Sequence, residues 1–183
     1  MKISFIVEGT DDEEFIKYCL EDRLSENGHQ VEYIVPLYGS KIFNDCHKHV
    51  NLHLNSYSIQ RVFILVDLHK FPCKTYVLEK FGALRDNPNV KIIIVIKEIT
   101  AWFLADFEAI EWVNKGSAKI LKSITVHENT ESLSNPKEVF NQLKGKKIKV
   151  RTLLKRKIAK QFDLIRARTR NPSLNRLLNE LGL

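Results

Sequence analysis

The first half of the chain alternates short apolar runs with longer amphipathic stretches. The apolar runs are rich in β-branched residues and cover Ile3–Val7, Val31–Val35, Val62–Val66 and Lys91–Ile96. Nearly continuous hydrophobicity over such short runs is typical of strands that are buried on both faces. The stretches between them have helical character and cover Asp11–Leu24, Lys41–Leu54 and Lys74–Arg85. This alternation predicts an α/β fold with a Rossmann-like, parallel four-stranded sheet and helices on both faces.

After the fourth apolar run the pattern becomes helical. Ile99–Val113 is predicted as one helix. Asn135-Pro136 and Asn171-Pro172 each predict an N-cap followed by proline at the first helical position. We therefore expect an α/β domain over residues 1–113 and a C-terminal helical appendage over residues 114–183, packed on it as one compact unit.

The charge of the chain is divided unevenly between these two parts. The formal net charge is +7, yet residues 1–113 hold 12 basic and 17 acidic side chains, whereas residues 114–183 hold 17 basic and 5 acidic ones. A basic segment attached to an acidic one favours a polyanionic partner for the basic part.

Several protein classes are disfavoured by simple patterns. The longest aliphatic run, Ile92–Ile96, is far too short to span a membrane, and the first residues lack the apolar core of a secretory signal. Three dispersed cysteines (Cys19, Cys46 and Cys73) fit a reducing compartment better than a disulfide scaffold. We expect a cytoplasmic protein with no membrane partner.

Carboxylates follow three of the four predicted strands. Glu8-Gly9 follows the first strand, Asp67 the third and Glu98 the fourth, and Asp12 lies one turn into the first helix. Because ligands of such sheets bind at the carboxyl ends of the strands, these side chains are expected to share one site. Close carboxylates repel one another unless a cation neutralises them, and Mg²⁺ or Mn²⁺ is the natural choice for oxygen ligands. The alternative for each single carboxylate is a cap on the following helix.

These motifs resemble the Toprim superfamily. Val7-Glu8-Gly9 with Asp12 is similar to its Glu-Gly-x-x-Glu opening, and Asp67 to Pro72 is similar to its Asp-x-Asp position. A branch of standalone Toprim-like proteins of unknown function is closer still, with Asp-x-Tyr-x-x-Pro there and Glu-x-Glu-Ala-x-x-x-x-Asp at a position that corresponds to Glu98–Asp106. Its later landmarks resemble Asn135-Pro136-Lys137 and Asn171–Leu174, so the resemblance spans almost the whole chain.

The resemblance implies a metal-dependent nuclease or nicking domain, often encoded beside an ABC- or AAA-type ATPase in anti-phage defence. Glu8 is then a metal ligand or general base, Asp67 the central metal ligand, and Asp12 and Glu98 support a second ion. His69 stands where the superfamily has a second Asp, and Thr100 where the branch has a second Glu. These departures are compatible with one-metal chemistry, with His69 as a metal ligand, or with an inactive site.

A dense basic stretch in the last third predicts contact with a phosphate backbone. The residues expected to bind nucleic acid are Lys146, Lys147, Lys149, Arg151, Lys155, Arg156, Lys157 and Lys160. Such contacts are sensitive to salt and largely blind to sequence. Aromatic residues are sparse in this stretch, which does not indicate stacking on single-stranded bases. The alternative partner is an acidic protein surface, such as that of an ATPase.

Two other candidates are less favoured. His49 and His53 lie four apart on a predicted helix, but no third zinc ligand has suitable spacing, so a solvated helix face is the preferred interpretation. Cys73 has no evident histidine base nearby in the sequence, which disfavours a nucleophilic role.

The leading hypothesis is therefore a Mg²⁺- or Mn²⁺-dependent nuclease with Glu8, Asp67 and Asp12 as catalytic residues. The main alternative is a non-catalytic subunit that binds nucleic acid or an ATPase through a degenerate site. A phosphatase with Asp67 as nucleophile is disfavoured, because no Asp follows two residues later. A homo-oligomer is compatible with the sequence.

Overall fold

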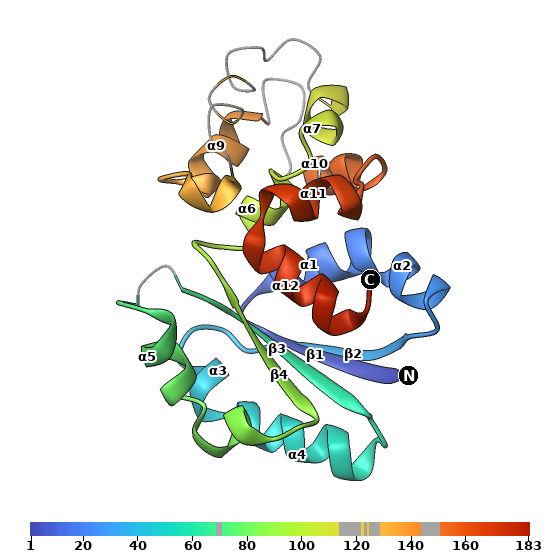
Figure 1. The fold of residues 1–183 in the computed structure, drawn as a ribbon, viewed down its shortest axis with the longest axis vertical. Coiled ribbons are helices and arrows are strands. Elements are labelled where there is room, and N and C mark those ends of the chain that lie inside the picture. The colour runs from blue at the N-terminus through green and yellow to red at the C-terminus, as the bar shows by residue number, and fades with distance from the viewer. Residues whose placement is uncertain (69–70, 114–121, 123, 125–128, 144–150) are drawn as a thin grey trace.

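A parallel four-stranded sheet forms the centre of the molecule, as predicted (Figure 1). The computed structural model describes residues 1–68, 71–113, 122, 124, 129–143 and 151–183. The strands lie in the order β2-β1-β3-β4. Their bounds are β1 Lys2–Val7, β2 Gln30–Pro36, β3 Arg61–Asp67 and β4 Val90–Val95. The sequence therefore located all four strands, with a difference of no more than one residue at each end.

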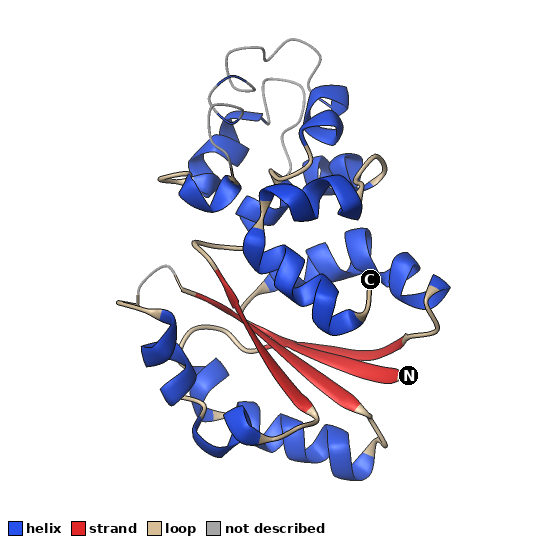
Figure 2. Cartoon of the chain, viewed as in Figure 1, coloured by secondary structure: helices blue, strands red, loops and turns tan. Residues whose placement is uncertain are grey.

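Helices cover both faces of this sheet (Figure 2). The helical segments of residues 1–86 are α1 Thr10–Phe15, η1 Ile16–Leu20, α2 Glu21–Glu26, α3 Lys41–Asn44, α4 Cys46–Ser56, α5 Lys74–Glu79 and η2 Gly82–Asp86. The predicted helix over Asp11–Leu24 is confirmed, with the π-helical turn η1 in its middle. Each of the other two predicted crossover helices is divided into two segments.

Alternate residues of β1 show how the two faces are packed. Ile3, Phe5 and Val7 join the apolar cluster under α1 and the last helix, α12 (Pro172–Leu181), whereas Ile6 joins the cluster under α4 and α5. Side chains of a strand point alternately to opposite faces, so one continuous apolar run supplies two cores. This explains why the strands lack polar alternation.

The helices that follow β4 lie on the same side of the sheet as α1 (Figure 1). They are α6 Thr100–Phe103, α7 Phe107–Val113, η3 Thr130–Ser132, α9 Pro136–Leu143, α10 Arg151–Ala159, α11 Leu164–Arg170 and α12 Pro172–Leu181. In α12 the leucines of the predicted stripe, Leu174, Leu177, Leu178 and Leu181, are all buried. All described helices are too short or too polar to cross a bilayer.

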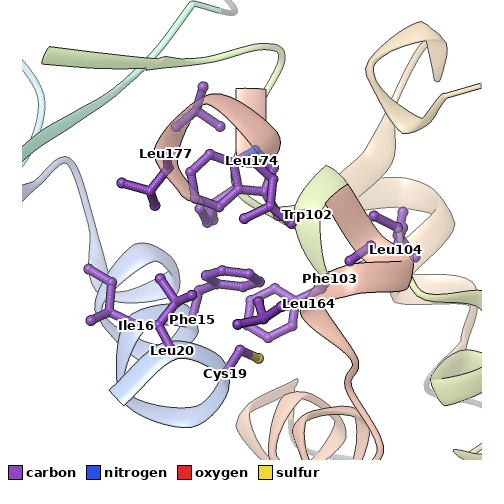
Figure 3. Packing of buried hydrophobic residues seen from close by; sticks show 14 of the residues in the cluster. Phe15, Ile16, Cys19, Leu20, Trp102, Phe103, Leu104, Leu164, Leu174 and Leu177 are labelled. Atoms are coloured by element: carbon purple, nitrogen blue, oxygen red, sulfur yellow. The ribbon is translucent and has the colours of Figure 1, made fainter. Parts of the chain in front are cut away.

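One apolar core contains residues from both of the predicted parts, 1–113 and 114–183. Phe15 contacts Trp102 and Phe103 edge-on at centroid distances of 5.3 and 4.9 Å, and leucines of α11 and α12 complete the same cluster (Figure 3). The Ser173 hydroxyl accepts a hydrogen bond from Trp102 Nε1 at 2.9 Å. The last helices therefore cover one face of the sheet as an integral layer.

The N-cap predicted at Asn171-Pro172 is confirmed. Asn171 is buried, and its Oδ1 accepts a hydrogen bond from the backbone N–H of Leu174 at 2.9 Å. Its Nδ2 donates to the hydroxyl of Thr130 at 2.9 Å. The same side chain therefore starts α12 and ties it to η3.

The single helix predicted over Ile99–Val113 is wrong, because the chain breaks between α6 and α7 at Asp106. Asp106 Oδ1 accepts a hydrogen bond from the backbone N–H of Ala109, and so caps α7. The buried carboxylate also forms a two-point ion pair with Arg166, at 3.1 and 2.9 Å, and accepts from the backbone N–H of Asp163 at 2.7 Å. It thereby joins α7 to the start of α11.

We expect Asp106→Ala to lower the free energy of unfolding by about 3 kcal/mol, because it leaves two backbone N–H groups without their acceptor and removes the two-point ion pair with Arg166. Urea unfolding followed by circular dichroism measures this change. Glu108→Ala is the matched control, since the Glu108 side chain is 72% exposed and reaches the same Arg166 at 3.4 Å. That variant should change stability by less than about 0.5 kcal/mol. Equal effects of the two substitutions would contradict this role of Asp106.

Candidate metal and phosphate site

A cleft of about 780 Å³ lies at the carboxyl ends of the strands. Its described lining comes from the last residue of β3, the loops after β1, β2 and β4, the start of α1 and the start of α9. These residues are Glu8, Gly9, Thr10, Asp11, Asp12, Tyr38, Asp67, Lys97, Glu98, Ile99, Ser134, Asn135, Pro136 and Lys137. The structure therefore brings together the four carboxylates that the sequence singled out, Glu8, Asp12, Asp67 and Glu98.

Glu8 links the ends of two neighbouring strands. Val7 is the last residue of β1 and pairs with Leu65 in β3, which places Glu8 beside the end of β3. Glu8 Oε2 accepts a hydrogen bond from the backbone N–H of Asp67 at 3.0 Å. This contact orients both carboxylates, because it fixes one oxygen of Glu8 and the backbone that carries Asp67.

Asp12 is the most deeply buried of the cleft carboxylates, with 3% of its surface exposed. Its Oδ1 accepts no hydrogen bond from a described residue. Gly9 precedes α1 in an extended conformation with φ −160°, which any residue adopts. A side chain at Gly9 would lie 3.6 Å from Asp12 Oδ2, an ordinary contact distance. The backbone therefore gives no steric reason for glycine here.

Burial and mutual repulsion favour the protonated carboxyl groups. Desolvation, followed by the charge of Glu8, raises the pKa of Asp12 to about 7. Desolvation also raises the pKa of Asp67 well above its usual range, and the charges of Asp12, Glu8 and Glu98 add to that effect. Near neutral pH the cluster therefore holds a proton or needs a cation in its place.

Lys97 joins β4 to Glu98 through an unusual backbone. Its φ of 66° lies in the left-handed region, where residues with a side chain are uncommon. The chain turns there, and the Glu98 carbonyl accepts a hydrogen bond from the N–H of Ala101 at 2.9 Å as α6 begins. This turn sets both the Lys97 and the Glu98 side chains against the cleft.

The opposite wall of the cleft comes from the helical region. Asn135 forms the predicted cap of α9, because its Oδ1 accepts a hydrogen bond from the N–H of Glu138 at 3.1 Å. The cleft reaches Lys137, in the first turn of this helix. Neither Lys97 nor Lys137 forms an ion pair with a described residue. Two cationic side chains thus border a cleft with an acidic floor.

The donor chemistry of the cleft fits a hard divalent cation. Five carboxylates line the cleft, namely those of Glu8, Asp11, Asp12, Asp67 and Glu98. Oxygen ligands completed by water suit Mg²⁺ or Mn²⁺. Within the described ranges, no three His, Cys, Asp or Glu side chains already form a metal-binding group. His69 lies outside the described residues, and Thr100 is buried in α6 and does not line the cleft.

The structure contradicts the prediction that Lys155 contacts nucleic acid. Lys155 is 1% exposed, and its ammonium group forms ion pairs with Asp11 and Glu14 of α1. It also lies 5.6 Å from the ring centroid of Phe103. The stripe of charge in the sequence did not reveal this, because the partners lie more than 130 residues earlier. Lys155 fixes α10 to the helix that carries Asp12.

The rest of the predicted phosphate-binding stretch is divided. Arg156, Lys157 and Lys160 are exposed on or next to α10. Arg156 also donates a hydrogen bond to the hydroxyl of Tyr18 at 2.9 Å. Lys146, Lys147 and Lys149, together with the side chain of Arg151, lie outside the described residues. The exposed cations of this stretch in the described part of the chain are therefore Arg156, Lys157 and Lys160.

Helix α4, which carries His49 and His53, does not present both histidines to solvent as we expected. His53 is 1% exposed, and its Nδ1 lies 2.9 Å from the Ser4 hydroxyl under the other face of the sheet. Desolvation, followed by the charge of His49, lowers the pKa of His53. The spacing of the histidines in the sequence did not distinguish the buried His53 from its exposed neighbours on the same helix.

Cys73 is exposed and caps α5, with its Sγ 3.5 Å from the N of Tyr76.

The stability of the metal-free protein should depend on the ionisation of Asp12. Its pKa is raised on folding, so its neutral form stabilises the native state, and this stabilisation is lost as the pH rises through about 7. Between about pH 5 and about pH 8 in chelator, we expect Asp12→Asn to lose less stability than the unchanged protein, by on the order of 3 kcal/mol.

Urea unfolding at the two pH values measures this difference, with Asp22→Asn on α2 as the exposed control. His53 affects the pH dependence of stability in the opposite direction, because its lowered pKa makes the stability fall at low pH. This contribution is the same in all three proteins and does not affect the comparison. Parallel pH profiles of the unchanged protein and Asp12→Asn would contradict the proposed burial of charge at Asp12.

A comparison with known protein families found one family model that matches almost the whole chain. A family model described as "Domain of unknown function (DUF4276)" matches residues 7–182. Searches of curated proteins and of solved structures gave no match. The matched segment begins at the last residue of β1 and ends after α12, so it includes β2, β3 and β4, the residues that line the cleft and the helices that border it. The chain therefore belongs to the DUF4276 family.

Proposed function

We propose that this protein is a Toprim-like, metal-dependent nuclease that cleaves nucleic-acid phosphodiester bonds in the cleft. The observation that carries the proposal is the buried Asp12 carboxylate, whose Oδ1 accepts no hydrogen bond from a described residue and whose pKa is raised to about 7. Burying the charge of such a group beside Glu8 and Asp67 is unfavourable unless a proton or a cation compensates it. In the proposed nuclease a divalent cation takes the place of the proton.

The carboxylates divide the work according to their contacts. Asp67, Asp12 and Glu98 hold the cation, with His69 as a further candidate ligand. A bound Mg²⁺ or Mn²⁺ supplies charge neutralisation at the phosphate and lowers the pKa of a bound water. Glu8 is partly committed by the hydrogen bond from Asp67 N, and its other oxygen is the candidate proton acceptor. These assignments follow the resemblance of the motifs.

The cations at the cleft and on α10 suit a phosphate backbone. Lys97 and Lys137 face a site where a phosphate would approach the metal. Arg156, Lys157 and Lys160 present further charge on a helix that packs against α1. Phosphate contacts of this kind give affinity without reading the sequence. The resemblance also favours action beside an ABC- or AAA-type ATPase in anti-phage defence, and the dispersed cysteines favour the cytoplasm.

A non-catalytic subunit is the second candidate. It is favoured by the absence of a preformed three-ligand group among the described residues and by the position of Thr100, which is buried away from the cleft. In that function the cleft and the basic helix bind nucleic acid or an ATPase without cleaving a bond.

Cleavage separates the two candidates. We expect the purified protein to cut plasmid DNA, linear DNA or RNA with Mg²⁺ or Mn²⁺ and not with chelator. Asp67→Asn and Glu8→Gln should each lower the rate by at least about a hundredfold, because they remove a ligand or a proton acceptor. Glu26→Gln, an exposed carboxylate on α2, should retain the full rate. Metal-independent cutting, or equal loss in all three variants, would contradict the assignment, and binding without cutting, with or without an ATPase, would favour the second candidate.

The salt dependence of binding tests the role of α10. Replacing Arg156, Lys157 and Lys160 together by alanine should flatten the plot of log K against log salt by between about one and three units, since each phosphate contact on duplex contributes about 0.9. Fluorescence anisotropy with a labelled duplex measures the slope. The control removes the same charge from the other layer, in a Lys48→Ala, Lys74→Ala and Arg85→Ala triple variant. If both variants keep the original slope, the basic helix serves a protein partner.

A further inference from the structure

Tyr38 is an exposed aromatic side chain in the wall of the acidic cleft. It follows β2 and is 55% exposed, although it lines the same cleft as Glu8, Asp12 and Asp67. Ligand clefts commonly pair a few charged groups with an aromatic surface that holds the rest of the ligand. The residue lies outside the basic stretch, and the sequence pattern did not single it out.

The backbone around Tyr38 is anchored to the sheet. The N–H of Leu37 donates a hydrogen bond to the Val7 carbonyl at 2.8 Å, which extends the β1–β2 pairing to the residue before Tyr38. The carbonyl of Tyr38 then accepts from the N–H of Lys41 at 3.3 Å, across a turn in which Gly39 has φ 60°. The ring is therefore presented from a fixed turn, one strand away from Glu8.

The Tyr38 ring has no stacking or polar partner within the described part of the protein. Other exposed tyrosines have ring partners: Tyr33 stacks on Tyr57 at 4.7 Å, and the ammonium group of Lys80 lies 4.8 Å from the Tyr76 centroid. The Tyr38 side chain forms no hydrogen bond, ring contact or cation contact with a described residue. An aromatic face of this kind, beside charged groups, is available to a flat ligand.

We propose that Tyr38 stacks on an unpaired nucleobase next to the phosphate that the cleft binds. Rings of bases in a duplex are covered by their neighbours, and a single strand exposes them to aromatic side chains. Lys97 and Lys137 border the same cleft and suit the attached phosphate. The proposal rests on the proposed function and makes it more specific: the substrate is single-stranded, or locally unpaired, at the position that enters the cleft.

Binding of a single strand tests this role in the full-length protein. The probes are a fluorescein-labelled oligothymidine of about 15 nucleotides and a duplex of equal length, with Ca²⁺ in place of Mg²⁺. We expect Tyr38→Ala to weaken single-strand binding at least about tenfold, equivalent to about 1.4 kcal/mol, and to change duplex binding less than about twofold. Tyr38→Phe keeps the ring and should bind within about twofold of the unchanged protein.

Two controls make the result specific. Tyr57→Ala removes an exposed tyrosine at the end of α4, just before the amino end of β3 and therefore far from the cleft, and should not alter binding. The same strand with 2-aminopurine reports stacking directly, because its fluorescence should be quenched by the unchanged protein and not by Tyr38→Ala. Thermal unfolding should be the same for both, since the ring is exposed.

The outcomes separate this proposal from the proposed function. If Tyr38→Ala binds the single strand normally, or loses the single strand and the duplex equally, stacking on an unpaired base is wrong, whether or not the protein cleaves. If binding depends on Tyr38 but no metal supports cleavage, stacking stands and the nuclease is wrong. If thymidine monophosphate competes as well as the oligothymidine, the ligand is a free nucleotide and the proposal is overturned.

Discussion

The whole arrangement depends on the need to cover both faces of a parallel sheet. The crossover segments α3, α4 and α5 cover one face, and α1 and α12 cover the other. Because the last helix completes this layer, the basic C-terminal third cannot stand apart from the acidic first part. Trp102, Phe15 and the leucines of α12 lie in one core, and the Asn171 cap and the Ser173 hydroxyl fix the geometry at its edge.

That shared core has a chemical consequence at the carboxyl ends of the strands. Strand ends supply Glu8, Asp67 and Glu98 from one side, and the α9 start supplies Asn135 and Lys137 from the other. Lys155 contributes from a distance, because its ion pairs with Asp11 and Glu14 hold α10 against the helix that carries Asp12. The surrounding burial keeps Asp12 from solvent, which is the main reason why its pKa rises.

Much of the fold and of the acidic cluster could be predicted from local patterns. The four apolar runs predicted four parallel strands, and the position of a carboxylate after three of them predicted that Glu8, Asp67 and Glu98 would meet. The failures share a physical cause. Asp106 breaks a helix because its partners, Arg166 and Asp163, lie about 60 residues later, and His53 is buried because its helix packs over Ser4 of β1. Contacts between distant segments leave no period in the sequence.

By itself, the sequence determined the class of the fold, the positions of its four strands along the chain, and the gathering of carboxylates at one edge of the sheet. Periodicity and strand ends are local properties, so a one-dimensional pattern carries them. Only the tertiary structure decided which charges are available. It buried Lys155 between two carboxylates, left Arg156 and Lys157 exposed, and set the ring of Tyr38 in the wall of the cleft. Burial and pairing depend on neighbours across the fold, and side chains of the same type thus lie in different environments.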